Sequence, residues 1–506
     1  MNSLIKPRSV KVNSIISFIG ILLSRILGFA RDMLIGFLFG TSPITDAFNI
    51  TMKVVFYLAN QLSSAFNIGF LSIFIHTREG EGKQQAEKEA SQIFSFVATV
   101  GILVSLLIFL FAPFVALLYP GIPQETYRYL VLFLRITSIS FFLITVSGII
   151  WSIFQAYHIF TIPYIAVLIQ NTTIVLVIYF LKNYISLPLS VALGTLLMFL
   201  FTLIPLGKVQ KISLTIPSRK TILNFLSISS PTLISTGIIY FSVLADQIMA
   251  SFMPTGSITR LEYANKIASL PSAMFGIAIA GAFFPRLSEF VSRNQYDDFK
   301  SMLEKGISAI WFLTIPSAAG LILLAAHIIH LLFYFPGGKF TLSDVKLTGS
   351  AMAMYAIGIP FQSAIIAFNR GHYAFKDTLT PLKTSTITLI TNVILNYILG
   401  IVLKMGITGL ALGTSLSSML NFYLLGESID RKIHANVIKS LTKDFVRIVT
   451  YTLPMGGLLY ATMKYLPTLH KLTTLALIGE GVIVYGITVL VLKPEELYAL
   501  FRKKRV

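Results

Sequence analysis

The sequence contains no cysteine, and only 12% of its 506 residues are charged. The absence of cysteine excludes disulfides, thiolate metal sites and cysteine nucleophiles. Soluble domains carry about 25% charged residues, so the charge content here is about half of the usual value. Hydrophobic residues make up 55% of the chain, and the mean hydropathy is +0.79. The composition therefore indicates an all-α polytopic membrane protein.

Motifs of catalysis and nucleotide binding are also missing. The sequence has no His-Glu-x-x-His, no Gly-x-Ser-x-Gly and no phosphate loop. The predicted outside loops are short, whereas a polytopic glycosyl transferase or ligase usually needs a sizeable outside domain with clustered acids or histidines. We therefore expect a protein that is not an enzyme, with a polytopic enzyme of that class as the alternative.

Apolar stretches of about 20 residues, long enough to cross a bilayer, occur throughout the chain. Gly or Pro lies inside several of them, which membrane helices tolerate and transporters use as bends. The first stretch lacks a small-residue cleavage site, so we interpret it as a retained span. We predict fourteen transmembrane helices near residues 13–40, 46–75, 91–119, 128–157, 162–181, 186–207, 222–253, 260–285, 306–334, 347–369, 378–403, 407–426, 445–463 and 472–492.

Basic residues exceed acidic residues, with 40 Lys and Arg against 21 Asp and Glu and a net charge of +19. Such an excess often indicates nucleic-acid binding, but its distribution follows a membrane topology. With the N-terminus in the cytoplasm, 27 Lys and Arg residues fall in predicted inside segments and 8 in predicted outside segments. This asymmetry fits the positive-inside rule. We therefore expect no nucleic-acid partner, and both termini in the cytoplasm.

Short motifs recur at a nearly constant offset. The tetrapeptide Ala192-Leu-Gly-Thr195 recurs as Ala411-Leu-Gly-Thr414, and Asp32 and Asn171 have counterparts in Asp246 and Asn392, at offsets of 219, 214 and 221. These matches predict two parallel-repeat six-helix lobes with a substrate site between them, where rocking would give alternating access. The predicted boundaries are an N-lobe over 1–215, a C-lobe over 216–432, and two C-terminal helices with a cytoplasmic tail over 433–506.

Five basic residues remain that are assigned to neither the inside nor the outside segments. Within a span, a charge costs roughly 2.5–3.5 kcal/mol and usually faces a cavity or a partner. The five basic residues are Arg25, Arg31, Lys53, Arg135 and Lys266, and the acidic residues at similar depth are Asp32, Asp246, Glu262 and Glu480. Arg25 and Arg31 lie about 9 Å apart along one helix, and a bend near Gly28 would turn both toward one lumen. Because guanidinium groups match a diphosphate bidentately, the two arginines are candidates for binding an anionic lipid head group.

Each of these charges also has a purely structural interpretation. Arg31 and Asp32 would form a structural pair near the helix end, and Lys53 and Arg135 would snorkel or pair locally. Glu480 would face other helices. His327 and His330 would be packed interior or interfacial residues.

Short motifs follow one another in order along the first twelve predicted helices. The opening of the chain supplies Ser24-Arg-Ile-Leu-Gly-Phe-Ala-Arg-Asp32, Phe39-Gly40 and Thr45-Asp-Ala-Phe48. The eighth predicted helix supplies Tyr263-Ala-Asn-Lys-Ile, Leu270-Pro, Gly276-Ile-Ala and Phe284-Pro-Arg-Leu-Ser288. Later motifs are Thr314-Ile-Pro, Gly320-Leu, Ala356-Ile-Gly-Ile-Pro360 and Asp377-Thr-Leu-Thr-Pro381. In this order, the motifs resemble the MurJ (MviN) family.

The resemblance implies a lipid II flippase of the multidrug/oligosaccharidyl-lipid/polysaccharide (MOP) exporter superfamily, with a MATE-like fold. Its substrate would be an undecaprenyl-diphosphate-linked peptidoglycan precursor, moved outward across the bacterial cytoplasmic (inner) membrane. Arg25 and Arg31 fall on the helix-1 arginines attributed to head-group binding in that family. Lys266 falls where the Tyr-Ala-x-Arg motif has another arginine. Together with Asp32 and Lys53, they form the candidate substrate-binding set.

The second predicted helix departs from the family pattern. Members resemble Pro-x-x-x-Arg-x-x-x-x-Glu-Gly-Ala there, whereas this chain has Ala59 at the arginine position and Ser64 near the glutamate position. One cation and one acid are therefore missing. Lys53, about a turn and a half earlier, is a candidate substitute.

Asp246 is a lone carboxylate in a predicted span and needs a cation, a proton or a basic partner. Asn392, Asn396 and Thr414 offer the oxygen ligands that hard cations prefer. By resemblance, the family can carry a sodium site here, with Asn396 in place of a carboxylate. The expected coupling ion is therefore Na⁺ or H⁺, with no other cofactor.

The sequence therefore predicts a monomeric inner-membrane flippase for an undecaprenyl-diphosphate-linked glycolipid, in contact with membrane lipids. Two alternatives stay open within the superfamily: a paralogue that exports another lipid-linked oligosaccharide or a small molecule, and a non-transporting scaffold. An antiporter for cationic drugs would favour an acidic lumen, which the three membrane cations Arg25, Arg31 and Lys266 argue against.

Overall fold

The computed structural model describes residues 10–466 and 469–492, and this part of the chain is almost entirely helical. The helices form two compact units. The first runs to Ile258 and includes Gly337–Lys339, and the second contains Thr259–Pro336 and the chain from Phe340 onward. The predicted inside positions Lys6 and Arg8, and the predicted tail from residue 493, lie outside the described residues. The lobe boundary at 215/216, which rests on repeated motifs, stays a prediction.

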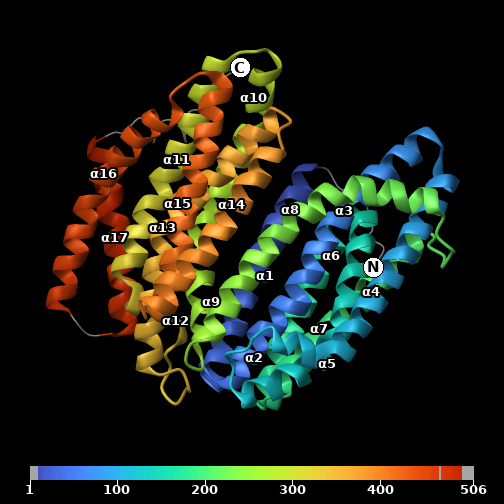
Figure 1. Cartoon of the computed structure of the whole chain (residues 1–506), viewed down its shortest axis with the longest axis horizontal. Helices are drawn as coiled ribbons and strands as arrows, with labels where there is room; N and C mark the ends of the chain where they lie inside the picture. Colours follow the sequence, from blue (N-terminus) through green and yellow to red (C-terminus); the bar gives the residue numbers. More distant parts are fainter. Residues whose placement is uncertain (1–9, 467–468, 493–506) are drawn as a thin grey trace. The chain divides into compact units, whose positions relative to one another are not determined.

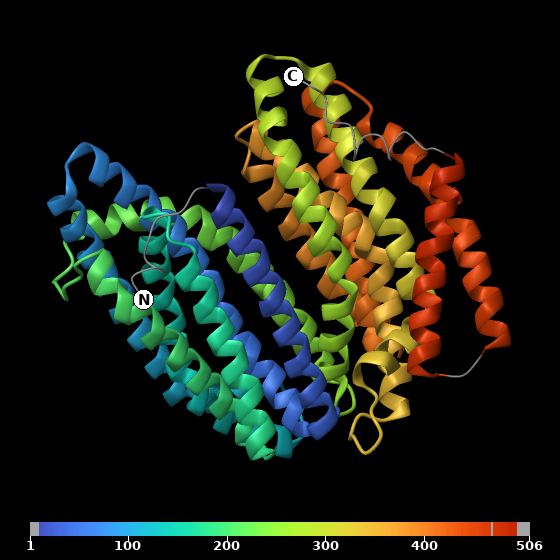
Figure 2. The same ribbon diagram turned by 180° about the vertical axis from the view of Figure 1, so that it is seen from behind.

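The first unit is built around the long helix α5. Helices α2, α3, α4 and α7 all pack against α5, while α1 lies along α6, as both views show (Figures 1 and 2). The elements are α1 (Val10–Phe39), α2 (Pro43–Thr51), the π-helix η1 (Met52–Tyr57), α3 (Leu58–Gly80), α4 (Lys83–Leu117), α5 (Gln124–Ala156), α6 (Thr161–Leu181), α7 (Ser186–Val209) and α8 (Arg219–Ser251).

The second unit is built around α13, against which α10, α11, α12 and α15 pack. Helices α16 and α17 pack together at one edge of this unit (Figure 2). The elements are α9 (Ser257–Ala268), which begins at the end of the first unit, η2 (Ser272–Gly276), α10 (Ile277–Ser292), α11 (Tyr296–Leu323), α12 (Ala325–Phe333), α13 (Leu342–Ala374), α14 (Leu379–Leu395), η3 (Asn396–Val402), α15 (Gly406–Ile433), α16 (Val437–Tyr465) and α17 (Lys471–Leu492).

Eleven helical segments of the described chain are long and apolar enough to cross a membrane, and each overlaps a predicted span. The three remaining predicted spans coincide with α1, α15 and α16, which contain 30, 28 and 29 residues. The all-α membrane fold is therefore confirmed, while the count of fourteen spans stays a prediction.

Two predicted spans differ from the structure in detail. The window 260–285 is divided into α9, η2 and α10, and its apolar segment is Ser272–Ser292. The window 306–334 is divided between α11 and α12, because Leu324 leaves the helical region at φ −93° and ψ 17°. Both sides of the break at Leu324 are apolar, so hydropathy gives no signal there. At η2 the signal was present, because α9 carries Arg260, Glu262 and Lys266 and is polar, whereas Ser272–Ser292 is apolar.

Backbone features repeat between the two halves at the offset that the motifs predict. The π-helices η1 and η2 begin 220 residues apart. Residues with positive φ recur at offsets of 216, 218 and 222, in the pairs Gly40 and Gly256, His158 and Lys376, and Lys182 and Lys404. Positive φ is uncommon outside glycine, so these coincidences support the parallel repeat independently of sequence similarity.

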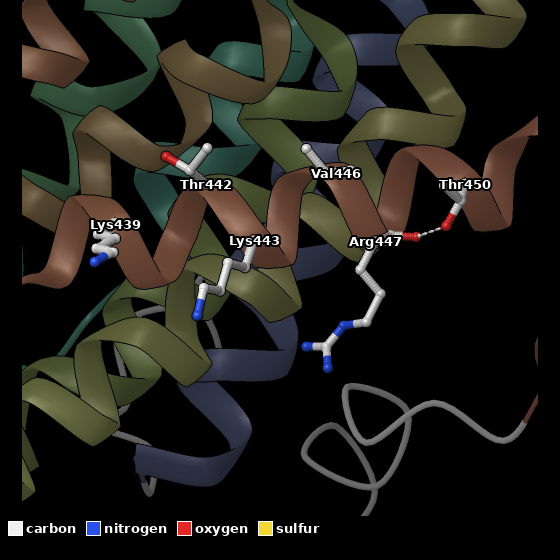
Figure 3. A pocket seen from close by; sticks show the side chains of 6 residues that line it. All are labelled: Lys439, Thr442, Lys443, Val446, Arg447 and Thr450. Atoms are coloured by element: carbon white, nitrogen blue, oxygen red, sulfur yellow. Dashed lines mark hydrogen bonds between the residues drawn. The ribbon is translucent and has the colours of Figure 1, made fainter.

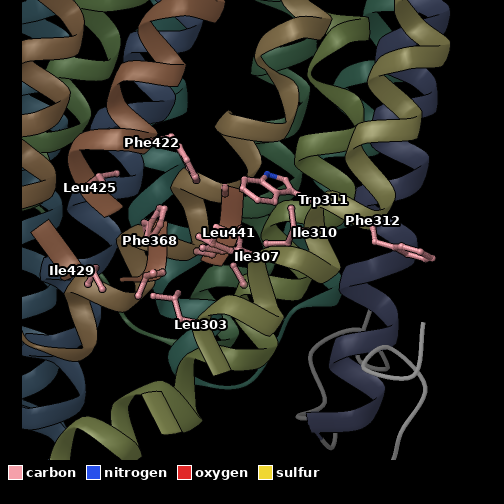
Figure 4. Packing of buried hydrophobic residues seen from close by; sticks show 14 of the residues in the cluster. Leu303, Ile307, Ile310, Trp311, Phe312, Phe368, Phe422, Leu425, Ile429 and Leu441 are labelled. Atoms are coloured by element: carbon pink, nitrogen blue, oxygen red, sulfur yellow. The ribbon is translucent and has the colours of Figure 1, made fainter. Parts of the chain in front are cut away.

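Helix packing in each unit depends on small residues, as expected where lipid removes the hydrophobic driving force between helices. A Cβ atom at Gly148 of α5 would collide with the Ser63 hydroxyl of α3, and one at Gly358 of α13 would contact Ser415 of α15 at 2.7 Å. In the second unit, the buried Trp311 of α11 lies in an apolar cluster and donates its indole N–H to the Pro360 carbonyl at 2.9 Å (Figure 4).

Candidate substrate and ion sites

Helix α1 carries the two candidate arginines. Arg25 is exposed and forms no ion pair with another described residue, whereas Arg31 is mostly buried. Both lie in one continuous helix, which runs through Gly28. The residue before Arg25 is fixed from a neighbouring helix, because Asn171 of α6 donates a hydrogen bond to the Ser24 hydroxyl at 3.2 Å. Asn171 thus anchors the arginine-bearing segment of α1.

Arg31 is paired with its neighbour Asp32. The Nη2 and Nε atoms of Arg31 lie 3.0 and 3.1 Å from Oδ1 of Asp32. The side chains are only 13% and 9% exposed, so the pair is shielded from water and its Coulomb attraction is stronger than at a surface. The structural pair that the sequence offered as an alternative is present.

Lys53 lies in η1, a π-helical turn of a kind that often marks functional sites. Its ammonium group is 5.4 Å from the centroid of the Tyr57 ring, and Tyr57 stacks on Tyr240 of α8 with centroids 6.0 Å apart. Lys53 is therefore held on an aromatic surface by a cation–π contact.

The departures in the second predicted helix have different surroundings. Ala59 is fully buried, while Ser64 is exposed. Further along α3, the Asn67 amide donates to Ser152 at 2.6 Å and to Gln155 at 3.1 Å on α5. This helix presents neutral polar groups where the family pattern has charges.

Lys266 belongs to the second unit and lies on α9. Its ammonium group is 3.6 Å from the Glu262 carboxylate one turn earlier, and their side chains are 33% and 11% exposed. The positive charge is therefore offset within its own helix. Nearby, the buried Tyr263 stacks on Phe333 with centroids 4.4 Å apart, which fixes α9 against α12.

Arg260 forms an ion pair that the sequence analysis missed. Its Nη2 atom is 2.8 Å from Oδ1 of Asp344, with side chains 13% and 6% exposed. Asp344 also accepts the backbone N–H of Thr341 at 2.8 Å in a capping box at the start of α13. The spacing of Thr341 and Asp344 was a readable cap signal, but its partner lies 84 residues away and left no local trace.

The three polar ion-site candidates of the second unit lie together. The Asn392 amide donates to the Thr414 hydroxyl at 3.1 Å, and the Asn396 amide donates to Oδ1 of Asn392 at 3.3 Å. Asn392 and Asn396 are buried, and a Cβ atom at Gly413 would collide with Oδ1 of Asn396. The fourth candidate, Asp246, lies on α8 in the first unit and is partly buried.

The remaining charged and imidazole side chains of the predicted spans have varied surroundings. Arg135 is exposed, with its guanidinium 5.9 Å from the centroid of the Phe109 ring. Glu480 accepts a hydrogen bond from Thr462 on α16 at 2.7 Å, and both His327 and His330 are 6% exposed. Within the described ranges, no group of three or more His, Cys, Asp and Glu residues is arranged to hold a metal ion.

One surface hollow, of about 650 Å³, lies along α16 and contains none of these candidates. Its lining comes from a single helix and includes three basic side chains, as Figure 3 shows: Lys439, Thr442, Lys443, Val446, Arg447 and Thr450.

Comparison with known proteins gives consistent matches along the chain. The family model "Lipid II flippase MurJ" matches residues 35–479. A "Probable lipid II flippase MurJ" from Thermotoga maritima is 28% identical over 491 residues, which cover 96% of this chain and 97% of that protein.

Two solved structures are similar to this chain over most of its length. A lipid II flippase MurJ in an inward closed conformation has a TM-score of 0.82 at 28% identity, covering 97% of this chain and 100% of the other. An inward-facing MATE family multidrug transporter of the MOP superfamily has a TM-score of 0.65 at 13% identity, covering 84% and 95% of the two chains. The latter shows the shared fold alone and confirms the MATE-like architecture.

Proposed function

The chain belongs to the lipid II flippase MurJ family, and we propose that it moves lipid II from the inner to the outer leaflet of the bacterial cytoplasmic membrane. The observation that carries this proposal is the family match over residues 35–479. The similarity to a solved lipid II flippase, which covers 97% of the chain, agrees with it.

We propose that the cations of α1 bind the diphosphate of the substrate. Arg25 is exposed and available for a bidentate contact with phosphate oxygens. Arg31 has its guanidinium fixed by Asp32, so it is preorganised and its conformational cost on binding is small. Lys53 and Lys266 extend the positive charge available to the head group. Binding and release suffice for flipping, so no covalent step is required.

We further propose that the protein acts as a monomer, with both termini in the cytoplasm. The distribution of Lys and Arg between predicted inside and outside segments, 27 against 8, supports this orientation. Transport proceeds by alternating access, with the lipid tail staying in the bilayer while the head group crosses.

Ion coupling through Asp246 is part of the same proposal. A carboxylate within a membrane span is costly when charged, so it takes up Na⁺ or H⁺ at one stage of the cycle. The linked amide and hydroxyl groups of Asn392, Asn396 and Thr414 supply neutral oxygen ligands in the second unit. Neutral ligands hold sodium less strongly than the carboxylate they replace.

Complementation tests the proposed function. The full chain, with an epitope tag, is expressed in a bacterium whose own lipid II flippase is switched off, and growth and lipid II translocation are measured. We expect rescue by the wild-type chain, loss of rescue by Arg25→Ala and Arg31→Ala, and retention by Arg135→Ala as the matched control.

Two outcomes would contradict parts of this proposal. Absence of rescue despite membrane expression would favour a paralogue with another substrate, or a scaffold. The missing charges at Ala59 and Ser64 would then explain why the chain does not transport lipid II. Rescue that both arginine variants retain would remove the α1 arginines from the mechanism.

A further inference from the structure

We infer that the outer face of α16 is a binding site for one anionic phospholipid, separate from the transported substrate. The proposal concerns a structural lipid, so it holds whatever head group the chain transports. Membrane orientation enters only in deciding which leaflet supplies the lipid.

Three basic residues form the polar part of this site. Lys439, Lys443 and Arg447 follow one another at intervals of four residues, so they lie on one side of the helix, and all three are exposed. Figure 3 shows Lys443 and Arg447 projecting from the same side of α16. Arg447 already contacts Asp444 at 2.6 Å, whereas Lys439 and Lys443 form no ion pair within the described part of the chain. Two exposed ammonium groups therefore face the hollow with their charge uncompensated.

An exposed apolar line runs beside the basic residues, on the adjoining side of α16 from which Val446 projects (Figure 3). Val446, Leu453 and Tyr460 are spaced by seven residues and are 57%, 63% and 67% exposed. Seven residues advance about 10 Å along a helix, so Val446 and Leu453 span most of one leaflet, whose hydrocarbon is about 15 Å thick. Leu453 and Tyr460 lie beyond the last cation, Arg447, along the axis of α16, so head-group contacts precede acyl-chain contacts, as in a phospholipid.

The opposite side of α16 is committed to the protein. Asp444 accepts a hydrogen bond from Ser308 of α11 at 2.5 Å, and Ile448 is fully buried in the cluster around Trp311. The first amides of the helix are also occupied, because Asp430 accepts the backbone N–H groups of Val437 and Ile438. The basic side chains, rather than the helix terminus, therefore provide the anion contacts.

Charge decides the class of lipid. A zwitterionic head group carries no net charge and gains little from paired lysines, whereas each Lys near an anionic surface contributes about fivefold in affinity. Phosphatidylglycerol and cardiolipin have the required head group. A free phosphate ion shares the phosphate chemistry but has no acyl chains to cover the apolar line.

The test uses the purified full chain in neutral detergent. Phosphatidylglycerol, phosphatidylcholine with the same acyl chains, and inorganic phosphate are each titrated while the thermal unfolding midpoint is followed and retained lipid is counted by native mass spectrometry. We expect phosphatidylglycerol alone to raise the midpoint. The Lys439→Gln/Lys443→Gln variant, which loses two lysines, should need about 25-fold more phosphatidylglycerol for the same rise. The Lys83→Gln/Lys88→Gln variant, which removes two exposed charges from α4, should behave as wild type.

Several outcomes would overturn the inference. Equal responses to phosphatidylglycerol and phosphatidylcholine would remove the anionic specificity, and an equal response to inorganic phosphate would make the site a simple anion site. An unchanged response in the α16 double variant would place the lipid elsewhere. Native mass spectrometry would also detect a species with twice the mass of the chain in phosphatidylcholine. If the α16 double variant abolished that species, this face of α16 would bind a second copy of the chain.

Discussion

Charges within the helices are offset by nearby groups at the scale of single residues. Arg31 contacts Asp32, Lys266 contacts Glu262, and Lys53 lies over the Tyr57 ring. Such pairing reduces the free-energy cost of a charge away from water. Arg25 differs, since it is exposed and forms no ion pair within the described residues. It is therefore the cation of this set best placed to contact a diphosphate.

Asp377 gives a prediction at the same scale, outside the membrane spans. The carboxylate caps α14 by accepting the Thr380 N–H at 2.9 Å and pairs with the Lys432 ammonium at 2.9 Å. Burial raises the pKa of Asp377, but the hydrogen bonds from Thr380 and Lys432 outweigh burial and hold it below the ordinary 3.8. We expect Asp377→Ala to lower the free energy of unfolding by about 1–2 kcal/mol. Asp377→Asn, which retains a capping oxygen, should lower it less.

The sign of the pH dependence follows from the depressed pKa. The folded state binds this proton less readily than the unfolded state, so the stabilisation is complete above pH 4 and declines as the pH falls below the ordinary value. The difference in thermal unfolding between wild type and Asp377→Ala should therefore be constant from pH 6 to about pH 4 and narrow progressively as the pH falls further below the ordinary pKa of 3.8. A difference that does not narrow below pH 4 would show that the charge of Asp377 contributes nothing.

At the scale of helices, close packing depends on glycine residues, which have no side chain to separate the two backbones. Helices α3 and α5 approach at Gly148 and Ser63, and α3 approaches α8 at Gly69 and Ser229. Only glycine leaves room for the serine hydroxyl at these crossings. In a bilayer such contacts carry much of the association, because lipid tails solvate apolar side chains as well as a neighbouring helix does.

Gly148→Ala tests this packing. The added methyl group collides with the Ser63 hydroxyl, so we expect a loss of about 1–3 kcal/mol in the free energy of unfolding. In a background that already carries Ser63→Gly, Gly148→Ala should lower the free energy of unfolding much less, because the hydroxyl with which its methyl group collides is absent. Gly207→Ala is the matched control, since a Cβ atom there meets nothing within 4 Å. Equal effects of the two alanine variants would contradict a specific role for the α3–α5 crossing.

The whole molecule consists of two units that repeat backbone features at offsets of 216 to 222 residues. The repeat relates Gly40 to Gly256 and Lys182 to Lys404, positions that a residue-by-residue similarity search would not single out. Such duplication supplies the two related halves that alternating access uses. A coupling ion would act at this scale, because it biases the equilibrium between whole-molecule states.

Asp246 provides the prediction for ion coupling. Transport of lipid II by the reconstituted wild-type chain should depend on a gradient of Na⁺ or of H⁺, and Asp246→Ala should abolish that dependence. Asp246→Asn imitates the protonated carboxyl and therefore distinguishes proton coupling from sodium coupling. If the coupling ion is H⁺, the variant should preserve one half of the transport cycle. If it is Na⁺, the variant should abolish the sodium dependence altogether. Ion dependence that is unchanged in Asp246→Ala would discard the coupling role.

The sequence by itself determined the membrane class, most of the spans and the family. Hydropathy and the distribution of Lys and Arg are local properties, measured against a bilayer of fixed thickness, and need no knowledge of helix contacts. The motifs likewise identified Asn392, Asn396 and Thr414, which lie within hydrogen-bonding distance in the structure.

Only the tertiary structure decided which charges are paired and which helices touch. Arg260 meets Asp344 across 84 residues, and Asn171 meets Ser24 across 147. Nothing in either local segment encodes its partner, because such contacts depend on how distant helices pack. The break at Leu324 was hidden for a related reason: the residues on both sides are apolar and satisfy the bilayer equally, so the backbone geometry there is set by packing.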